Sequence, residues 1–299
     1  MNKQLELDTS LFGSAMSSSF ATPLRYPGGK GRLGAWLAEV IRHNNLQEGC
    51  YVEPYAGGAG AAMYLLLKEH VSSIVINDAD PAIHAFWWAV LNDSERLVSL
   101  IRETPVTMDT WHQQRSIVDT PGEADTTTLG FATFFMNRTN RSGIISGGVI
   151  GGKGQSGDYK LDARYNIEGL CKRIKDIAAR RDDISLYDVD AMDLIQPGFL
   201  ENPESCLIYL DPPYYNKANQ LYRNFYKPED HAEIAKKVMA LETPWLVTYD
   251  NCEEIKSLYK GAECEEFSLH YSTHLKRPKA KEVLFYKNIA LGRTPTLKR

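Results

Sequence analysis

Cys206-Leu207-Ile208-Tyr209-Leu210-Asp211-Pro212-Pro213-Tyr214 is the stretch of sequence that decides the fold. Its apolar first half predicts a buried strand that ends abruptly at the two prolines. Two prolines fix the torsion φ and remove two backbone donors, so the loop after the strand is stiff. A carboxylate, a free carbonyl group and an aromatic ring are therefore held at the carboxyl end of a strand, the edge where open α/β sheets bind ligands.

This loop has the groups needed to bind an exocyclic amine on a planar base. Asp211 and the carbonyl group of Pro212 would accept the two amine hydrogens, and Tyr214 would stack on the ring. The alternative is a proline-rich turn in which Asp211 is only a cap. The loop alone leaves both interpretations open.

A second motif joins a strand to a turn of small residues and a helix: Tyr51-Val52-Glu53-Pro54-Tyr55-Ala56-Gly57-Gly58-Ala59-Gly60-Ala61-Ala62. Small residues let the backbone approach a ligand, and a helix N-terminus offers free N–H groups. The next apolar strand ends in Asn77-Asp78, which is typical of a dinucleotide-type site whose acid binds ribose hydroxyls. The glycine spacing is not GxGxxG, which disfavours nicotinamide and flavin cofactors. A tight turn without a ligand explains the glycines but not Asp78.

A third motif, Leu24-Arg25-Tyr26-Pro27-Gly28-Gly29-Lys30, places an aromatic ring and a lysine on one short loop before a predicted helix. Its alternative is an ordinary turn with a solvated lysine. Along the chain the order is the PGGK loop, the cofactor turn and then DPPY. In that order the three motifs resemble the Dam-like (D12 class) family of adenine-specific DNA N6-methyltransferases, from about residue 24 to residue 288. DPPY by itself also occurs in methyltransferases that act on RNA bases and on protein glutamine, whereas the three motifs in series are much more specific.

The resemblance implies S-adenosylmethionine as cofactor, without a metal, and duplex DNA as substrate. It assigns catalysis to the DPPY loop, comprising Asp211, Pro212, Pro213 and Tyr214. It assigns the cofactor to a larger set, with Asp78 on the ribose hydroxyls and Asp211 near the methionine amino group: Tyr26, Lys30, Glu53, Pro54, Tyr55, Gly57, Gly58, Asp78, Asp190 and Asp211. For Asp190 the alternative role is helix capping.

The segment from Phe134 to Gly143 is similar to the Asn-Arg segment before the family's recognition loop, and glycines are frequent from Gly143 to Gly157. The candidate DNA-contacting residues are Arg25, Arg138, Asn140, Arg141, Ser142 and Lys153. Members that methylate GATC carry an aromatic-asparagine pair where this chain has Arg141-Ser142, and Arg25 replaces their usual lysine. These departures put recognition of GATC in question.

The predicted fold is α/β, a doubly wound and mostly parallel Rossmann-like methyltransferase sheet with a mainly helical inserted target-recognition domain. The expected layout is a flexible leader over 1–21, a catalytic domain over 22–90 and 184–290, an insert over 91–183, and a tail over 291–299. Strands are predicted at 50–53, 74–77, 184–189, 206–210, 245–248 and 282–286, with a late hairpin-like pair closing the sheet. Helices are predicted at 82–91, 94–102, 130–138 and 167–180.

Composition sets limits on the function class. The 299 residues are 43% hydrophobic and carry a net charge of −4, but basic residues outnumber acidic ones between 131 and 181. No apolar run reaches the roughly 18 residues of a membrane span, and no signal peptide is recognisable, so we expect a cytoplasmic protein. The five cysteines show no CxxC pairing, which gives no indication of a metal site. A monomer or weak dimer is expected, and a restriction-enzyme partner is left open.

Two other functions remain open from the sequence. A methyltransferase acting on an RNA base or a protein glutamine would share DPPY and the cofactor turn, but would not need the third motif, Leu24 to Lys30, or the basic insert. A DNA-binding relative that has lost catalysis would keep the fold, although the presence of Asp211, Asp78 and Lys30 favours an active enzyme.

Overall fold

A computed structural model of the chain describes residues 21–25, 30–196, 198–200, 205–215, 226–270 and 279–292. Tyr26 and nearly all of the expected leader and tail lie outside these residues. Within them, seven strands form one sheet with the order β3-β2-β1-β4-β5-β7-β6. The strands are β1 Cys50–Glu53, β2 Ser73–Asn77, β3 Ile184–Tyr187, β4 Cys206–Leu210, β5 Trp245–Asp250, β6 Glu263–His270 and β7 Lys279–Lys287.

The first five strands are parallel, and β7 pairs antiparallel with both β5 and β6. This confirms the predicted α/β class, including the closing hairpin. The chain builds β1, β2 and β3 outward in one direction and then returns to place β4 on the other side of β1. The carboxyl ends of β1 and β4 therefore flank the point where the strand order reverses, which is where ligands bind in such sheets.

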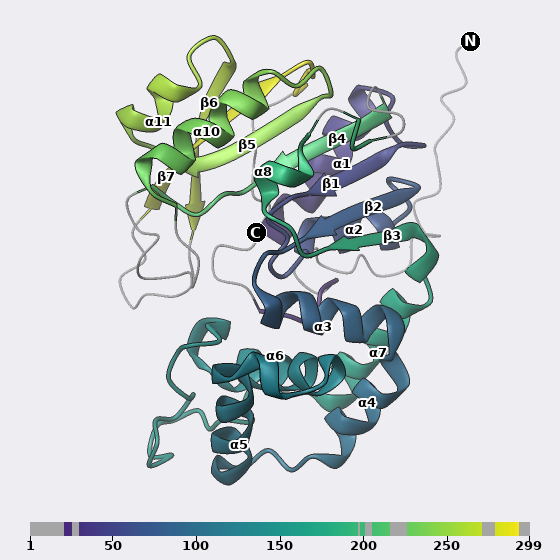
Figure 1. Ribbon diagram of the computed structural model, residues 1–299, viewed down its shortest axis with the longest axis vertical. Helices are drawn as coiled ribbons and strands as arrows, with labels where there is room; N and C mark the ends of the chain where they lie inside the picture. Colours follow the sequence, from purple (N-terminus) through teal and green to yellow (C-terminus); the bar gives the residue numbers. More distant parts are fainter. Residues whose placement is uncertain are drawn as a thin grey trace, which may run out of the picture.

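Alternation along each strand divides the apolar side chains between two layers. Tyr51, Leu207 and Tyr209 belong to one buried cluster, and Val52 and Ile208 belong to the other. Helices cover both faces of the sheet in the part of the chain that the structure describes (Figure 1). They include α1 Gly34–His43 and α2 Gly60–Leu67 on one side, and α8 Ala191–Leu194, α10 Pro228–Met239 and α11 Glu253–Leu258 on the other.

The segment between β2 and β3 is helical. Figure 1 shows its helices gathered at one end of the molecule, with α3 nearest the sheet. They are α3 Pro81–Asn92, α4 Ser94–Glu103, α5 Met108–Asp119, α6 Thr126–Thr139 and α7 Ile167–Ala178. Phe86 of α3 stacks on Phe134 of α6 with ring centroids 6.0 Å apart, so the insert shares a core with α3. No helix in the described residues is long and apolar enough to span a membrane.

Among the described helices, α5, α8, α10 and α11 were not predicted, and α6 begins at a different residue. Helix α5 was not predicted, because it buries a mixed stripe of Thr110, Trp111, Gln114 and Val118 rather than a run of apolar residues. Helix α6 begins earlier than predicted, since the Asp125 side chain accepts a hydrogen bond from the amide of Thr128 and starts the helix there.

The insert is tied to the loop that leads to Lys30. The Asn137 side chain accepts from the amide of Arg25 at 2.8 Å and donates to the Arg25 carbonyl at 2.7 Å and the Gly143 carbonyl at 2.8 Å. Gly143 has φ 78°, and a Cβ atom there would collide with the Arg25 carbonyl oxygen, so only glycine fits. Arg25 of the third motif is thus held against the insert.

The buried side chain of Asn77 joins three strand ends. It donates to the carbonyl groups of Pro54 at 2.9 Å and Val189 at 3.0 Å, and accepts from the Val189 amide at 3.1 Å. These bonds fix the loops after β1, β2 and β3 relative to one another. The carboxyl edge of the sheet is therefore organised before any ligand binds.

We predict that Asn77→Ala lowers the free energy of unfolding by about 1–3 kcal/mol, because the buried carbonyl group of Pro54 and two partly buried backbone groups of Val189 lose their partner. Urea unfolding followed by circular dichroism measures this. Asn92→Ala is the matched control, since Asn92 is exposed and its amide bonds only the Trp88 carbonyl within its own helix. Equal effects of the two substitutions would contradict the role given to Asn77.

Candidate active site

The carboxyl edge of the sheet collects the acidic residues that the motifs predicted. Asp78 follows β2, Asp211 follows β4 and Glu53 ends β1, and these three strands are neighbours in the sheet. Asp190 follows β3 three residues after its last residue. Parallel strands bring these residues to one edge, so each of the strands β1 to β4 contributes one acidic residue to the site.

Lys30 and Asp211 form the closest ion pair of this edge. The Lys30 ammonium donates to both carboxylate oxygens of Asp211, at 2.8 Å to Oδ1 and 3.0 Å to Oδ2. A second carboxylate, Glu282 of β7, approaches the same ammonium with its Oε2 at 3.6 Å. The Lys30 and Glu282 side chains are almost fully buried, whereas that of Asp211 remains 22% exposed. Asp211 is thus the member of the cluster that a ligand can reach.

The cluster has the electrostatics of a buried cation between two carboxylates. Burial alone would lower the pKa of Lys30, but Asp211 and Glu282 outweigh that effect and raise its pKa well above the usual value. Burial raises the pKa of Glu282, and Asp211 adds to the rise while Lys30 opposes it. Lys30 is therefore a permanent cation that holds Asp211 in place.

A second set of hydrogen bonds orients Asp211 from the side of β5. The Thr248 hydroxyl group donates to Asp211 Oδ1 at 2.8 Å, and Tyr209 and Thr248 share a hydrogen bond of 2.9 Å between their hydroxyl oxygens. Thr248 has one hydroxyl hydrogen, so Tyr209 is the donor in that second bond. Asp211 Oδ1 thus has two donors, and Oδ2 has one.

Tyr214 is buried, and its hydroxyl group donates to Glu282 Oε1 at 2.7 Å. The Lys30 ammonium lies 5.5 Å from the centroid of the Tyr214 ring. The loop turns away after Tyr215, whose amide donates to Asp250 at 2.8 Å. Pro212 and Pro213 keep the main chain between Asp211 and Tyr214 stiff.

The turn after β1 is built on two buried acids. Glu53 accepts from the Tyr51 hydroxyl group at 3.0 Å and from the Ala62 amide at 3.2 Å. Asp78 accepts from the amides of Gly57 at 2.8 Å and Asp80 at 2.9 Å. Burial raises the pKa of Glu53 to about 8 and that of Asp78 to about 7. Both acids therefore bind protons near neutrality and suit neutral hydroxyl or amine donors.

The remaining predicted cofactor residues lie around the same edge. Gly57 adopts φ 47° and Gly58 is buried beside it. The Tyr55 hydroxyl lies 2.9 Å from that of Tyr226, and the two rings meet edge to face. Asp190 is exposed and caps α8 by accepting from the Met192 amide at 2.7 Å, which is the alternative role that the sequence left open.

The predicted DNA-contacting residues fall into two groups. Arg141 and Lys153 are exposed and Ser142 is half-buried. Asn140 is fully buried, where it accepts from Trp111 Nε1 at 2.8 Å and donates to two carbonyl groups of its own loop. Its side chain is therefore used inside the insert and is not offered to a ligand at the surface.

Arg25 and Arg138 lie at the junction of the insert with the loop before Lys30. Arg138 donates to the Arg164 carbonyl at 2.7 Å, and Arg25 donates to the Asn140 carbonyl at 3.2 Å. Burial, and then the charge of Arg25, lowers the pKa of Arg138 to about 9. Positive charge is thus concentrated at this junction.

The residues that sequence reasoning missed are the supports of the predicted ones. Glu282 and Thr248 contact Lys30, Tyr214 or Asp211 but lie outside the three motifs. Tyr209 lies in the strand of the DPPY motif and supports Asp211 through Thr248. The one signal was polarity inside an apolar strand, at Thr248 in Trp245–Asp250 and at Glu282 in Lys279–Lys287.

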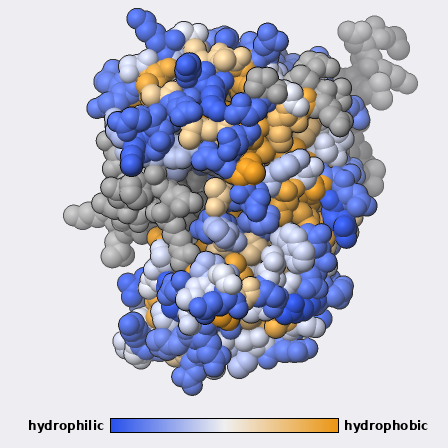
Figure 2. Space-filling view, viewed as in Figure 1, coloured by the Kyte–Doolittle hydropathy of each residue, from blue (hydrophilic) through white to orange (hydrophobic). Residues whose placement is uncertain are grey.

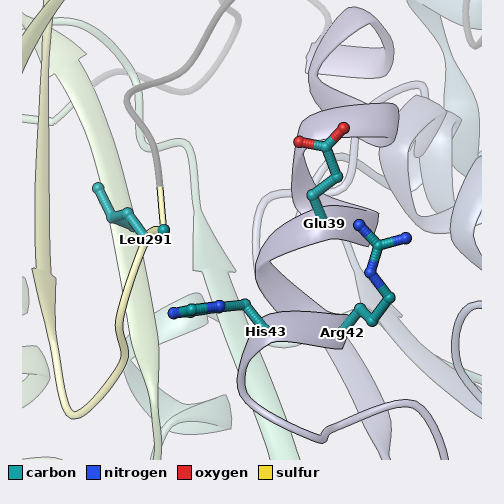
Figure 3. A pocket seen from close by; sticks show the side chains of 5 residues that line it. Glu39, Arg42, His43 and Leu291 are labelled. Atoms are coloured by element: carbon teal, nitrogen blue, oxygen red, sulfur yellow. The ribbon is translucent and has the colours of Figure 1, made fainter. Parts of the chain in front are cut away.

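A surface pocket lies elsewhere. Figure 3 shows it between the end of α1 and the segment after β7, lined by Glu39, Arg42, His43, Leu291 and Gly292. Helix α1 ends shortly before β1 begins, so this pocket is at the amino edge of the sheet and contains none of the predicted site residues.

Figure 2 shows apolar residues at the surface in the middle of the molecule, between hydrophilic upper and lower parts. No group of three potential metal ligands occurs within the described part of the chain.

Comparison with known proteins decides the family. A family model described as D12 class N6 adenine-specific DNA methyltransferase matches residues 26–277. The chain belongs to this family. It is also 22% identical over 294 residues to the Type II methyltransferase M.MjaIII of Methanocaldococcus jannaschii, covering 88% of this chain and 96% of the relative. Among solved structures, the rRNA methyltransferase aviRa from Streptomyces viridochromogenes aligns with a TM-score of 0.36 at 13% identity, covering 84% of this chain and 82% of that one.

The raised pKa of Glu53 has a consequence for stability. Its pKa rises from 4.5 to about 8 in the fold, so below about pH 4.5 both folded and unfolded chains hold the proton. Above that pH the unfolded chain ionises first. The free energy of unfolding therefore falls as the pH rises toward 8, by up to about 1.4 kcal/mol per pH unit from this one group.

We predict that Glu53→Gln makes the free energy of unfolding less dependent on pH between about 4.5 and 8, because the group that titrates is gone. In Glu53→Gln a slope of the same sign remains, because the pKa of Asp78 is also raised in the fold, but it is smaller than the wild-type slope, to which both acids contribute. Urea unfolding at a series of pH values measures both slopes, with the exposed Glu48→Gln as control. Identical slopes in the wild type and Glu53→Gln would show that Glu53 is ionised in the fold.

Proposed function

We propose that this methyltransferase transfers the methyl group of S-adenosylmethionine to N6 of an adenine that is flipped out of duplex DNA. The observation that carries the proposal is Asp211, fixed by Lys30 and Thr248 at the switch point of the sheet yet still partly exposed. A rigid, accessible carboxylate beside a free Pro212 carbonyl group and an aromatic ring matches the amine edge of adenine. The family supports the DNA substrate.

The chemistry required of the protein is to make N6 a better nucleophile. Its lone pair is delocalised into the adenine ring, so N6 must become more tetrahedral before it attacks. Asp211 and the Pro212 carbonyl group draw on its two hydrogens and localise the lone pair for in-line attack on the methyl group. Asp211 Oδ1 already accepts from Lys30 and Thr248, whereas Oδ2 accepts only from Lys30. Oδ2 is therefore the oxygen that receives the N6 hydrogen.

The cofactor residues fit S-adenosylmethionine, which supplies a methyl group already activated on a cationic sulfonium. Asp78 would bind the ribose hydroxyl groups, and the main chain of the Gly57–Gly58 turn would lie against the neighbouring part of the cofactor, as in dinucleotide-type sites. Lys30 with two carboxylates carries one net negative charge when all three are ionised, which complements a cation. Tyr26, Lys30, Glu53, Pro54, Tyr55 and Asp190 complete the proposed set.

The helical insert over residues 91–183 would position the DNA, with the catalytic domain on either side of it in the sequence. The proposed DNA contacts are made by exposed Arg141 and Lys153, by half-buried Ser142, and by the charged junction at Arg25 and Arg138. Asn140 would act indirectly, by fixing the loop that follows it. Flipping the base costs a few kcal/mol, which stacking on Tyr214 would offset. We place the enzyme in the cytoplasm as a monomer or weak dimer.

The reaction is tested with purified protein, labelled S-adenosylmethionine and duplex DNA, RNA or protein as acceptor. We predict label in N6 of DNA adenine, and loss of all transfer in Asp211→Ala with DNA affinity unchanged, because Asp211 acts on the amine rather than on the duplex. Asp211→Asn is the isosteric companion variant. Full activity in Asp211→Ala would contradict the mechanism, label in RNA or protein would contradict the substrate, and no transfer by the wild type would support an inactive relative.

DNA binding is tested by the salt dependence of affinity. Lys153→Gln should reduce the slope of log affinity against log salt by about 0.9, the value for one lost phosphate contact. Arg96→Gln is the matched control, because it removes the same charge from the same insert but Arg96 is already paired with Asp125 at 2.9 and 3.0 Å. Fluorescence anisotropy measures both slopes. Affinity independent of salt in the wild type would exclude a nucleic-acid substrate.

A further inference from the structure

Glu282 is a buried carboxylate that neither the motifs nor the proposed mechanism uses. It lies on β7, more than sixty residues after the DPPY loop, and is 1% exposed. It accepts the Tyr214 hydroxyl hydrogen at 2.7 Å and approaches the Lys30 ammonium at 3.6 Å. Its nearest polar contacts are therefore residues of two different motifs.

Charge balance alone does not explain this residue. Lys30 already donates to both oxygens of Asp211 at 2.8 and 3.0 Å, so its charge has a counter-ion without Glu282. Burying a further carboxylate has a large desolvation cost, which the Lys30 ammonium at 3.6 Å and the Tyr214 hydroxyl group at 2.7 Å both offset. The bond from Tyr214 is the shorter of these two contacts, and Asp211 does not share it.

The Tyr214 ring is the part of the DPPY loop that the prolines do not fix. Pro212 and Pro213 hold the main chain, but rotation about the side-chain bonds of Tyr214 stays free unless the ring is anchored at its far end. The hydroxyl bond to Glu282 is that anchor, and the Lys30 ammonium lies over the same ring at 5.5 Å from its centroid. The orientation of the ring is thus set by β7 rather than by its own loop.

We propose that Glu282 is a positioning residue for methyl transfer: through the Tyr214 hydroxyl group it holds the ring in the orientation that stacks on the flipped base. This rests on the proposed function, because it assigns a task within base binding. In this role Glu282 would act through its hydrogen bond with Tyr214. A small misplacement of a stacking group lowers the rate steeply, since it shifts N6 away from the methyl donor.

A double-mutant cycle with Tyr214→Phe tests the proposal. Glu282→Ala removes the acceptor, Tyr214→Phe removes the donor, and Glu282→Gln keeps an amide oxygen that can accept the same bond. Three readouts are needed: the initial rate of DNA methylation, fluorescence of 2-aminopurine in place of the target adenine, and calorimetric affinity for S-adenosylhomocysteine. Thermal unfolding of each variant shows whether it is folded.

We expect Glu282→Ala and Tyr214→Phe each to lower kcat on the order of tenfold or more, the effect of losing one hydrogen bond to a charged group. The 2-aminopurine signal should fall in parallel, with affinity for S-adenosylhomocysteine unchanged. The double variant should be no slower than either single variant, and Glu282→Gln should recover most of the rate.

Five outcomes would overturn the proposal. Multiplying effects in the double variant would show that Glu282 acts independently of Tyr214. A loss of S-adenosylhomocysteine affinity equal to the loss of rate would place Glu282 at the cofactor through Lys30, and a Glu282→Gln as slow as Glu282→Ala would assign its role to charge. Wild-type protein that does not methylate DNA overturns this inference together with the proposed function, whereas an active wild type with unaffected variants overturns this inference alone.

Discussion

The structure depends on one buried lysine. An ammonium group withdrawn from water costs several kcal/mol unless carboxylates surround it, and Lys30 obtains them from Asp211 and Glu282. These residues come from the N-terminal loop, the end of β4 and the closing strand β7. Lys30 can contact both carboxylates only if β4 lies beside β1 and the β6–β7 hairpin returns along β5. The ion cluster therefore requires the strand order that also creates the ligand crevice.

The same constraint explains why the DPPY loop, the proposed catalytic loop, is preorganised. Asp211 is held by Lys30 on both oxygens and by Thr248 on one, and Thr248 is held in turn by Tyr209. Such a carboxylate does not need to reorient when a base arrives, which is the condition for strong electrostatic stabilisation. On the other side of the crevice, Asn77 fixes the loops that carry the cofactor turn and Asp78.

The sequence was most informative where a residue's role is local. Strands β1 and β4 form at the predicted residues, because a run of apolar side chains followed by glycine or proline identifies both the strand and its end. Helix α5 could not be recognised in the same way, since it buries Thr110 and Gln114 beside Trp111. Lys30 and Asp211 belong to motifs, and the structure brings them together. Glu282 and Thr248 lie in strands whose polarity is visible in the sequence, but their partners are far along the chain.

The insert shows the opposite limit. Asn140 and Arg141 are adjacent polar residues in a segment that resembles a DNA-contacting loop, yet one is fully buried and the other exposed. Residue type cannot separate these fates, because Asn140 is drawn inward by Trp111 and two carbonyl groups that only the fold supplies. The division between residues that shape the loop and residues that are exposed at its surface comes from the structure.

The central claim is that Asp211, held by Lys30, directs methyl transfer to adenine N6 in DNA. Its most direct test is modified-base sequencing of genomic DNA from cells that lack other methylation and express this chain. The account predicts N6-methyladenine confined to one short sequence context, and none in cells that express Asp211→Ala at the same level. Unmodified adenine in the wild-type cells, or the same N6-methyladenine in the variant cells, would contradict it.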